Sequence, residues 1–320
     1  MKTGIRNMRR VKEVRNDLVS IENRVAEFIE PYLNRIKQIG TNRDSYKIDE
    51  SIDIDKISTE HAIGLLRKKY PTSSIISEEV GKDLKSDYGF ILDIPDGSGN
   101  LTGKRPGLEN KWGISIAYFE GDSILAGVVL FPKADNALVK DTKDDPIKVC
   151  DAERLGKIDY NVRRGLHPLD GIIVTGGNYE EVLTDGAKAK YEDRINFFND
   201  ISEKLNWENQ SYFCATYDAL LLTKDSQRSI DDPAPDGARL HWSPTILYSW
   251  DIAATSRILE SEDLPMINLE TMKKVNLIND FDIYGNNDKY QQPIGAISGH
   301  PKITEIVLNE FENFKRKWNK

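Results

Sequence analysis

The chain has 320 residues, a length that fits about two domains or one large domain. Its 52 acidic and 44 basic residues give a net charge of −8, which argues against a protein whose main task is to grip a nucleic-acid backbone. Charged residues make up 30% and hydrophobic residues 39%, a balance typical of globular proteins, and no apolar run reaches the length of a membrane span.

Cysteine and histidine give little sign of a metal site. The two cysteines, Cys150 and Cys214, cannot build a disulfide scaffold or a zinc ribbon. The basic amino-terminal stretch is not followed by the apolar segment of a secretory signal, so we expect a reducing, cytoplasmic setting. None of the four histidines has the spacing of a metal ligand, and we interpret each as a surface or core residue: His61, His167, His241 and His300.

The first part of the chain predicts two helices followed by strands. Apolar residues at steps of three and four predict a long amphipathic helix from Val11 to Gly40, kinked at Pro31. A second helix is expected over about 56–69, before Pro71. Short apolar runs then predict strands at 74–76, 88–92, 113–118 and 123–131. The last two strands are expected to form a hairpin that turns at residues 120–122.

The second part of the chain is less regular. Residues 132–170 are polar and contain room for one strand, so we divide the chain into halves at 1–165 and 166–320. Residues 214–223 fit either a helix or a strand, and residues 228–241 have the composition of a loop. One strand and three helices are expected at 171–174, 188–205, 250–260 and 302–318. This mixture predicts an α/β (α+β) fold with a mixed sheet.

The segment Asp93-Ile-Pro-Asp96-Gly97-Ser98 is the densest group of chemically useful residues. A predicted strand delivers two carboxylates at its end, and carboxylate oxygens are ligands that suit Mg²⁺. Gly97 and Ser98 can open a turn whose backbone N–H groups bind a phosphate. Together these features are the equipment for metal-assisted hydrolysis of a phosphate ester. The alternative is an ordinary exit from a strand, where Asp-Gly-Ser is common.

Four further acidic residues have a functional and a structural interpretation. Glu78 and Glu79 follow a predicted strand and are either ligands or a solvated turn. Asp55 and Asp251 stand at the starts of predicted helices, where an aspartate often caps the helix. The triplet Asp53-Ile-Asp55 also occurs in metal-dependent glycosyltransferases, a weak signal because it has only three residues.

Taken in chain order, these segments resemble the inositol monophosphatase superfamily, the magnesium-dependent and lithium-sensitive phosphatases that include the fructose-bisphosphatases and the phosphoadenosine phosphate phosphatases. The resemblance covers about 55–132 and a short segment near 250. Its motifs are Ser77-Glu78-Glu79, Asp93–Leu101, Ser115-Ile-Ala117, Gly127–Pro132 and Trp250–Ala254.

The resemblance implies a fold and an activity. The fold is a layered αβαβα sandwich with mixed sheets, usually assembled as a homodimer. The activity is the Mg²⁺-dependent hydrolysis of a small phosphate monoester, such as an inositol phosphate, a sugar phosphate or phosphoadenosine phosphate, by metal-activated water. Two or three Mg²⁺ ions per site are implied, with a small phosphorylated substrate as partner and neither a nucleic-acid polymer nor a membrane.

The resemblance also assigns roles to individual residues. Glu78, Asp93 and the carbonyl of Pro95 hold one Mg²⁺, whereas Asp93, Asp96 and Asp251 hold a second. The backbone of Gly97 and Ser98 binds the phosphate. Ser98 and Asp55 orient or deprotonate the attacking water.

The chain departs from the superfamily pattern at several positions. The order Ile94-Pro95 reverses the usual Pro-Ile, and Thr59 replaces a glutamate. The second half diverges most, so the substrate contacts are assigned by position alone: Thr175, Gly176 and Arg239. These departures leave an alternative open, a catalytically silent member that binds a phosphorylated ligand.

Overall fold

The computed structural model describes most of the chain in fourteen stretches. They are residues 2–40, 54–101, 107–132, 137–140, 173–175, 192–205, 207–210, 213–220, 222, 240–261, 263–281, 283–284, 294–299 and 301–318. Everything below concerns these residues.

The first sheet has six strands in the order β2-β1-β3-β4-β5-β6. Their bounds are β1 Ser74–Ser77, β2 Gly81–Asp83, β3 Tyr88–Asp96, β4 Gly113–Glu120, β5 Ser123–Phe131 and β6 Ala137–Lys140. β1 and β3 are parallel, and the other neighbours are antiparallel. The predicted hairpin is confirmed, because β4 and β5 pair up to Glu120 and Ser123.

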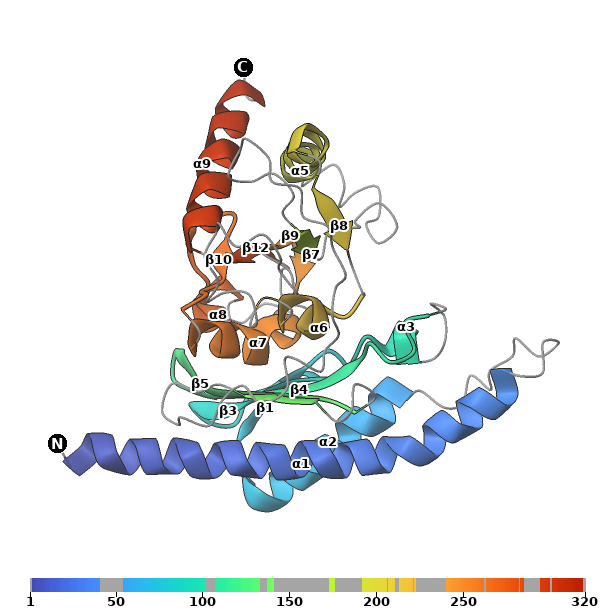
Figure 1. Cartoon of the computed structure of the whole chain (residues 1–320). Coiled ribbons are helices and arrows are strands. Elements are labelled where there is room, and N and C mark those ends of the chain that lie inside the picture. The colour runs from blue at the N-terminus through green and yellow to red at the C-terminus, as the bar shows by residue number, and fades with distance from the viewer. Residues whose placement is uncertain are drawn as a thin grey trace.

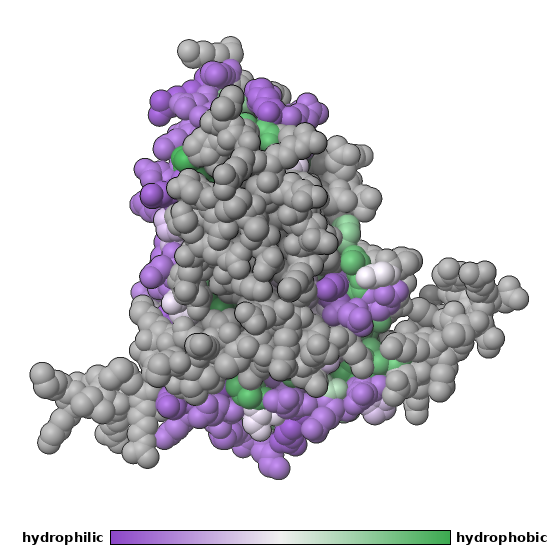
Figure 2. Space-filling view, viewed as in Figure 1, coloured by the Kyte–Doolittle hydropathy of each residue, from purple (hydrophilic) through white to green (hydrophobic). Residues whose placement is uncertain are grey.

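Two helices cover the outer face of this sheet. α1 spans Lys2–Gly40 and contains Pro31, and α2 spans Ile54–Lys69. Their apolar stripes form one buried cluster with alternate residues of β3, β4 and β5, as the helical periodicity predicts. The carboxyl-terminal part of α1 is angled away from the rest of that helix (Figure 1). The outward side of this helix layer is largely hydrophilic, at the bottom of Figure 2.

The second sheet also has six strands, in the order β11-β10-β12-β9-β7-β8. Their bounds are β7 Ile173–Thr175, β8 Glu208–Gln210, β9 Leu240–Leu247, β10 Ile267–Asn268, β11 Lys273–Lys274 and β12 Ile294–Gly299. The loop interpretation of 228–241 is wrong at its end, since Leu240 and His241 begin β9. Pro244 made a strand at this place hard to predict, because proline is rare inside sheets except at bulges. β9 has its bulge here, between Ser243 and Leu247.

The helices of the second half form two layers, one on each side of the second sheet (Figure 1). α6 Ala215–Leu220, α7 Ser249–Ser261 and α8 Leu277–Asp280 share a buried cluster with residues of the first sheet. α5 Glu192–Leu205 and α9 Pro301–Trp318 pack on the opposite face of the second sheet. Within the ambiguous segment 214–223, residues 215–220 form the helix α6.

The layers therefore follow the order αβαβα, and the predicted α/β sandwich with mixed sheets is confirmed. The division of the chain at 165 and 166 falls between β6 and β7, in a segment outside the described residues, and stays a prediction. Within the described stretches, no helix combines the length and the apolar character needed to cross a bilayer.

Candidate active site

The carboxyl ends of β1 and β3 bring the first two predicted ligands together. The strands are parallel, and Ser77 lies opposite Leu92. The residues that follow, Glu78 and Asp93, therefore lie beside each other at the same edge of the sheet. Glu78 is at the exposed rim of this edge, whereas Asp93 is only 6% exposed.

A bulge in β3 turns Asp93 and Asp96 toward the same side of the sheet. Asp93 pairs with Ser115 and Asp96 pairs with Gly113. Between these two pairs, β3 therefore has one residue more than β4. Without the extra residue, side chains three positions apart would point to opposite faces. The Ile94–Pro95 peptide bond within this bulge is cis. Both aspartates consequently face the middle helix layer.

α2 brings Asp55 to the same edge. The hydroxyl of Thr59, which replaces the superfamily glutamate, donates to the carbonyl of Ile94 at 3.0 Å. Asp55 is one helical turn before Thr59 and therefore lies on the same side of α2. α2 begins at Ile54, so Asp55 belongs to its first turn and the N-cap interpretation is wrong.

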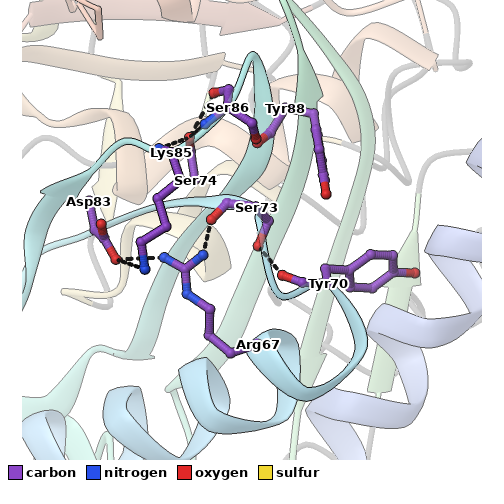
Figure 3. A network of polar contacts seen from close by, with 8 residues as sticks. All are labelled: Arg67, Tyr70, Ser73, Ser74, Asp83, Lys85, Ser86 and Tyr88. Atoms are coloured by element: carbon purple, nitrogen blue, oxygen red, sulfur yellow. Dashed lines mark hydrogen bonds and ion pairs between the residues drawn. The ribbon is translucent and has the colours of Figure 1, made fainter.

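A polar network fixes the other end of α2 against the first sheet (Figure 3). Arg67 pairs with Asp83 of β2 at 2.5 Å and also donates to the carbonyl of Ser73. The hydroxyl of Ser74 donates to the carbonyl of Ser86 at 2.7 Å. These contacts fix β1 and α2 relative to each other, and with them the positions of Glu78 and Asp55.

α7 supplies Asp251 from the second half. The backbone N–H of Tyr248 donates to Asp251 Oδ2 at 2.6 Å, which is one half of a capping box because α7 begins at Ser249. Small residues let α7 lie directly on β5. A Cβ added to Gly127 would be 2.4 Å from the carbonyl oxygen of Ala254.

The start of α6, with Cys214 just before it, contains site residues that the sequence analysis did not single out. Thr216 donates to Asp96 Oδ2 through its backbone N–H at 2.7 Å and through its hydroxyl. The thiol of Cys214 is 3.2 Å from the same oxygen, and the backbone N–H of Ala215 donates to Oδ1 at 3.2 Å. No motif marks these residues, since their partner Asp96 is about 120 positions away in the chain.

Gly97 and Ser98 form a tight turn into the short helix α3, Ser98–Leu101. Gly97 has a φ of 81°, and a Cβ there would be 3.0 Å from both the Cβ of Cys214 and the carbonyl oxygen of Lys111. The side-chain amide of Asn100 donates to that same carbonyl at 2.6 Å. Only glycine suits both this conformation and this spacing.

The five predicted carboxylates are linked electrostatically through Asp93. Burial raises the pKa of Asp93 well above its ordinary value. Four further acidic charges raise it as well: Asp96, Asp251, Glu78 and Asp55. Acidic residues of α2, β3, α7 and the turn after β1 are therefore close enough for their charges to interact, and their role as metal ligands stays a prediction.

The neighbouring carboxyl groups experience the same repulsion. Burial and the charge of Asp96 raise the pKa of Glu78, whose carboxyl group is partly buried. Burial raises the pKa of Asp251 well above its usual range, although the Tyr248 amide opposes the shift. Burial also raises the pKa of Asp96, against the hydrogen bonds from Thr216. A cation or protons must offset this concentration of negative charge.

The donors fit a magnesium ion in kind, because they are hard carboxylate oxygens. Their oxygens do not converge closely enough to hold a metal ion. In the described part of the chain, no three acidic, histidine or cysteine side chains are arranged as metal ligands.

The predicted substrate contacts are only partly visible. Thr175 ends β7, and its backbone pairs with that of His241 on β9. Gly176 and Arg239 lie outside the described residues.

The comparisons with known proteins agree with this architecture. No family model matches the chain. A curated inositol monophosphatase of Dictyostelium discoideum is 27% identical over 242 residues, which are 71% of this chain and 74% of that protein.

Three solved structures illustrate the structural similarity. Inositol monophosphatase II of Staphylococcus aureus has a TM-score of 0.60 at 16% identity, covering 93% of this chain and 95% of its own. The SuhB protein of Bartonella henselae has a TM-score of 0.62 at 16% identity, covering 93% and 98%. The inositol monophosphatase of Anabaena has a TM-score of 0.61 at 14% identity, covering 95% and 97%.

The chain thus has a layered αβαβα sandwich with an acidic site between its two sheets. This is the fold of the inositol monophosphatase superfamily, and the resemblance to that superfamily inferred from the motifs is confirmed.

Proposed function

We propose that this protein is a Mg²⁺-dependent phosphatase that hydrolyses a small phosphate monoester. The main support is the electrostatic interaction of Asp93 with four other carboxylates, on the fold shared with the inositol monophosphatases. Two structures of the similar staphylococcal enzyme are described as bound to inositol monophosphate and to 2′-AMP. Such ligands support a small phosphorylated substrate for this chain, with inositol phosphates, sugar phosphates and phosphoadenosine phosphate as candidates.

The proposed roles follow the position of each residue. Glu78, Asp93 and the Pro95 carbonyl would hold one Mg²⁺, and Asp93, Asp96 and Asp251 a second. When bound, such ions lower the pKa of water and offset the charge of the phosphoryl oxygens. The backbone of Gly97 and Ser98 would bind the phosphate, and Ser98 with Asp55 would orient the attacking water and accept its proton.

Phosphate release from a panel of these monoesters tests the proposal. We expect turnover with Mg²⁺ and none with a chelator. Asp93→Asn should lower the rate by about 100-fold or more, because it removes a charge from the centre of the site. Asp122→Asn, in the exposed turn between β4 and β5, is the matched control and should leave the rate unchanged. Turnover that is indifferent to metal, or retained in Asp93→Asn, would refute the mechanism.

A second candidate function is binding of a phosphorylated ligand without turnover. The observation that favours it is the open arrangement of the site, because no three of the described metal-ligating side chains close around one metal position. Tight binding of a panel member without any phosphate release would support this function, and robust turnover would exclude it.

The remaining expectations concern the setting of the protein. We propose one small phosphorylated substrate, no nucleic-acid polymer and no membrane as partners. The homodimer, the cytoplasmic location and the contacts of Thr175, Gly176 and Arg239 with substrate stay predictions.

A further inference from the structure

We infer that Thr216 is a positioning residue for Asp96: it holds one carboxylate oxygen, Oδ2, so that the other oxygen, Oδ1, is the atom offered to a divalent cation. The inference rests on the proposed metal site and adds to it a residue on the second half of the chain. Asp96 belongs to β3 of the first half, whereas Thr216 belongs to the second half. One half of the molecule would therefore orient a metal ligand of the other half.

The hydrogen bonds to the two oxygens of Asp96 are unequal. Oδ2 accepts the backbone N–H and the hydroxyl of Thr216, with the thiol of Cys214 at 3.2 Å. Oδ1 accepts the N–H of Ala215 at 3.2 Å, a longer bond. An ionised carboxylate has about four lone-pair positions, two on each oxygen. Oδ2 is therefore fully used by protein donors, whereas Oδ1 retains acceptor capacity for a cation.

Burial helps to keep the Asp96 carboxylate in this orientation. Thr216 is fully buried and Asp96 is 7% exposed, so water is a poor substitute for the threonine hydroxyl. A carboxylate that lost this donor would be free to rotate toward other partners. Such rotation would turn Oδ1 away from the cation and weaken its binding.

The donors are themselves held in place from the first half. Tyr217, which follows Thr216, accepts a hydrogen bond from Lys111 Nζ at 2.6 Å, and the same ammonium group lies 4.6 Å from the tyrosine ring centroid. The carbonyl of Lys111 in turn accepts from Asn100 of α3. These contacts connect α6, the segment before β4 and the turn after Asp96 in one frame, which is what a positioning role requires.

Binding of Mn²⁺ to the full-length protein, followed by electron paramagnetic resonance without substrate, tests the inference. Thr216→Val keeps the shape and the backbone donor but removes the hydroxyl, and we expect about tenfold weaker Mn²⁺ binding. Thr216→Ser restores a hydroxyl and should bind within about twofold of the wild type. Thr255→Val is the matched control: it removes a buried hydroxyl on α7 that bonds only to the carbonyl of Ile252, and it should bind Mn²⁺ normally.

Thr216→Ala, measured in parallel, removes the same hydroxyl without adding a methyl group, so the result does not depend on how one variant folds. Wild-type affinity in both Thr216→Val and Thr216→Ala overturns the inference while leaving the metal site intact. A wild-type protein that binds no Mn²⁺ overturns the proposed metal site and this inference together. Asp96→Asn serves as a reference, because it shows how much Mn²⁺ affinity is lost when the ligand itself is changed. The Thr216 variants should lose less affinity than this.

Discussion

The two sheets contribute differently to the candidate site. The first sheet supplies Glu78, Asp93 and Asp96 from strand ends, in short motifs that can be recognised along the chain. The second half supplies Asp251 and the donors that hold Asp96, through contacts between residues about 120 positions apart. The comparison teaches that the chemical groups of such a site are encoded locally, whereas their orientation depends on long-range packing.

The two halves also differ in what they bury. α1 places a carboxyl group, Glu22, in the apolar cluster beneath the first sheet. The second sheet buries an imidazole, His241 on β9, at 2% exposure. We therefore expect the two groups to change the free energy of unfolding in opposite directions as the pH changes. A bulky substitution at the contact between the halves should change the free energy of unfolding still more.

The largest effect is expected where α7 of the second half lies on β5 of the first. Gly127→Leu places a side chain where even a Cβ would be 2.4 Å from the backbone of Ala254. Because a backbone cannot give way as a flexible side chain does, we expect a loss of about 3 kcal/mol or more in the free energy of unfolding. Urea denaturation measures it.

Gly64→Ala provides the control for this substitution. Gly64 lies on α2, and no atom is within 4 Å of an added Cβ. Alanine should stabilise the helix by about 0.5–1 kcal/mol. A Gly127→Leu protein as stable as the wild type would mean that the halves are not closely packed at α7.

Much of the first sheet could be predicted because each strand is a short apolar run bounded by turn residues, as in 113–131. Asp93 and Asp251 become ligand candidates only through the order of the motifs along the chain, since each segment alone also fits an ordinary strand exit or helix cap. Local reading of the sequence could not find β9, since Pro244 stands inside the strand at a bulge. Nor could it find Cys214 and Thr216, whose importance comes only from their contact with Asp96. The contact joins residues about 120 positions apart, so no periodicity or motif along the chain predicts it.

His241 should make the second half sensitive to acid. Burial lowers the pKa of His241 to about 4, so the folded protein keeps it neutral while the unfolded chain takes up a proton near pH 6.5. Its stability contribution is therefore present above pH 6.5 and is lost as the pH falls toward 4, by at most about 3 kcal/mol. His241→Gln should reduce this loss of stability at low pH, as measured by urea denaturation at pH 7, 5.5 and 4.

His61 gives the corresponding test in the first half. Partial burial and the charge of Arg24 also lower the pKa of His61, so the sign of the effect is the same. The side chain stacks on Phe28 at the surface of α2, and we expect a smaller change for His61→Gln. Equal slopes for the two variants would contradict the contrast between the halves.

Glu22 should make the first half sensitive to alkali instead. Burial raises its pKa well above the ordinary value, against the effect of the Ile116 backbone. The folded protein thus binds this proton more tightly than the unfolded chain, and the stability present below about pH 4.5 is lost as the pH rises. Glu22→Gln should stabilise the protein by about 1–2 kcal/mol at pH 8 and little at pH 4.

Glu27→Gln, at an exposed position of the same helix, is the control for Glu22 and should change the unfolding midpoint equally little at both pH values. A Glu22→Gln protein that is no more stable than the wild type at pH 8 would show that the carboxyl group finds solvent or a cation in the folded state.

The smallest effect is expected at the edge of the interface between the halves. The hydroxyl of Tyr284, a residue that is 44% exposed, donates a shared hydrogen bond to the carbonyls of Asp87 at 3.3 Å and Gly121 at 3.1 Å. Tyr284→Phe removes this bond but keeps the edge contact of the ring with Phe119, so we expect a loss of about 0.5–1 kcal/mol in urea denaturation. Tyr284→Leu loses the ring contact as well and should cost more. If both variants match the wild type, α7 on β5 holds the halves together without help from this edge.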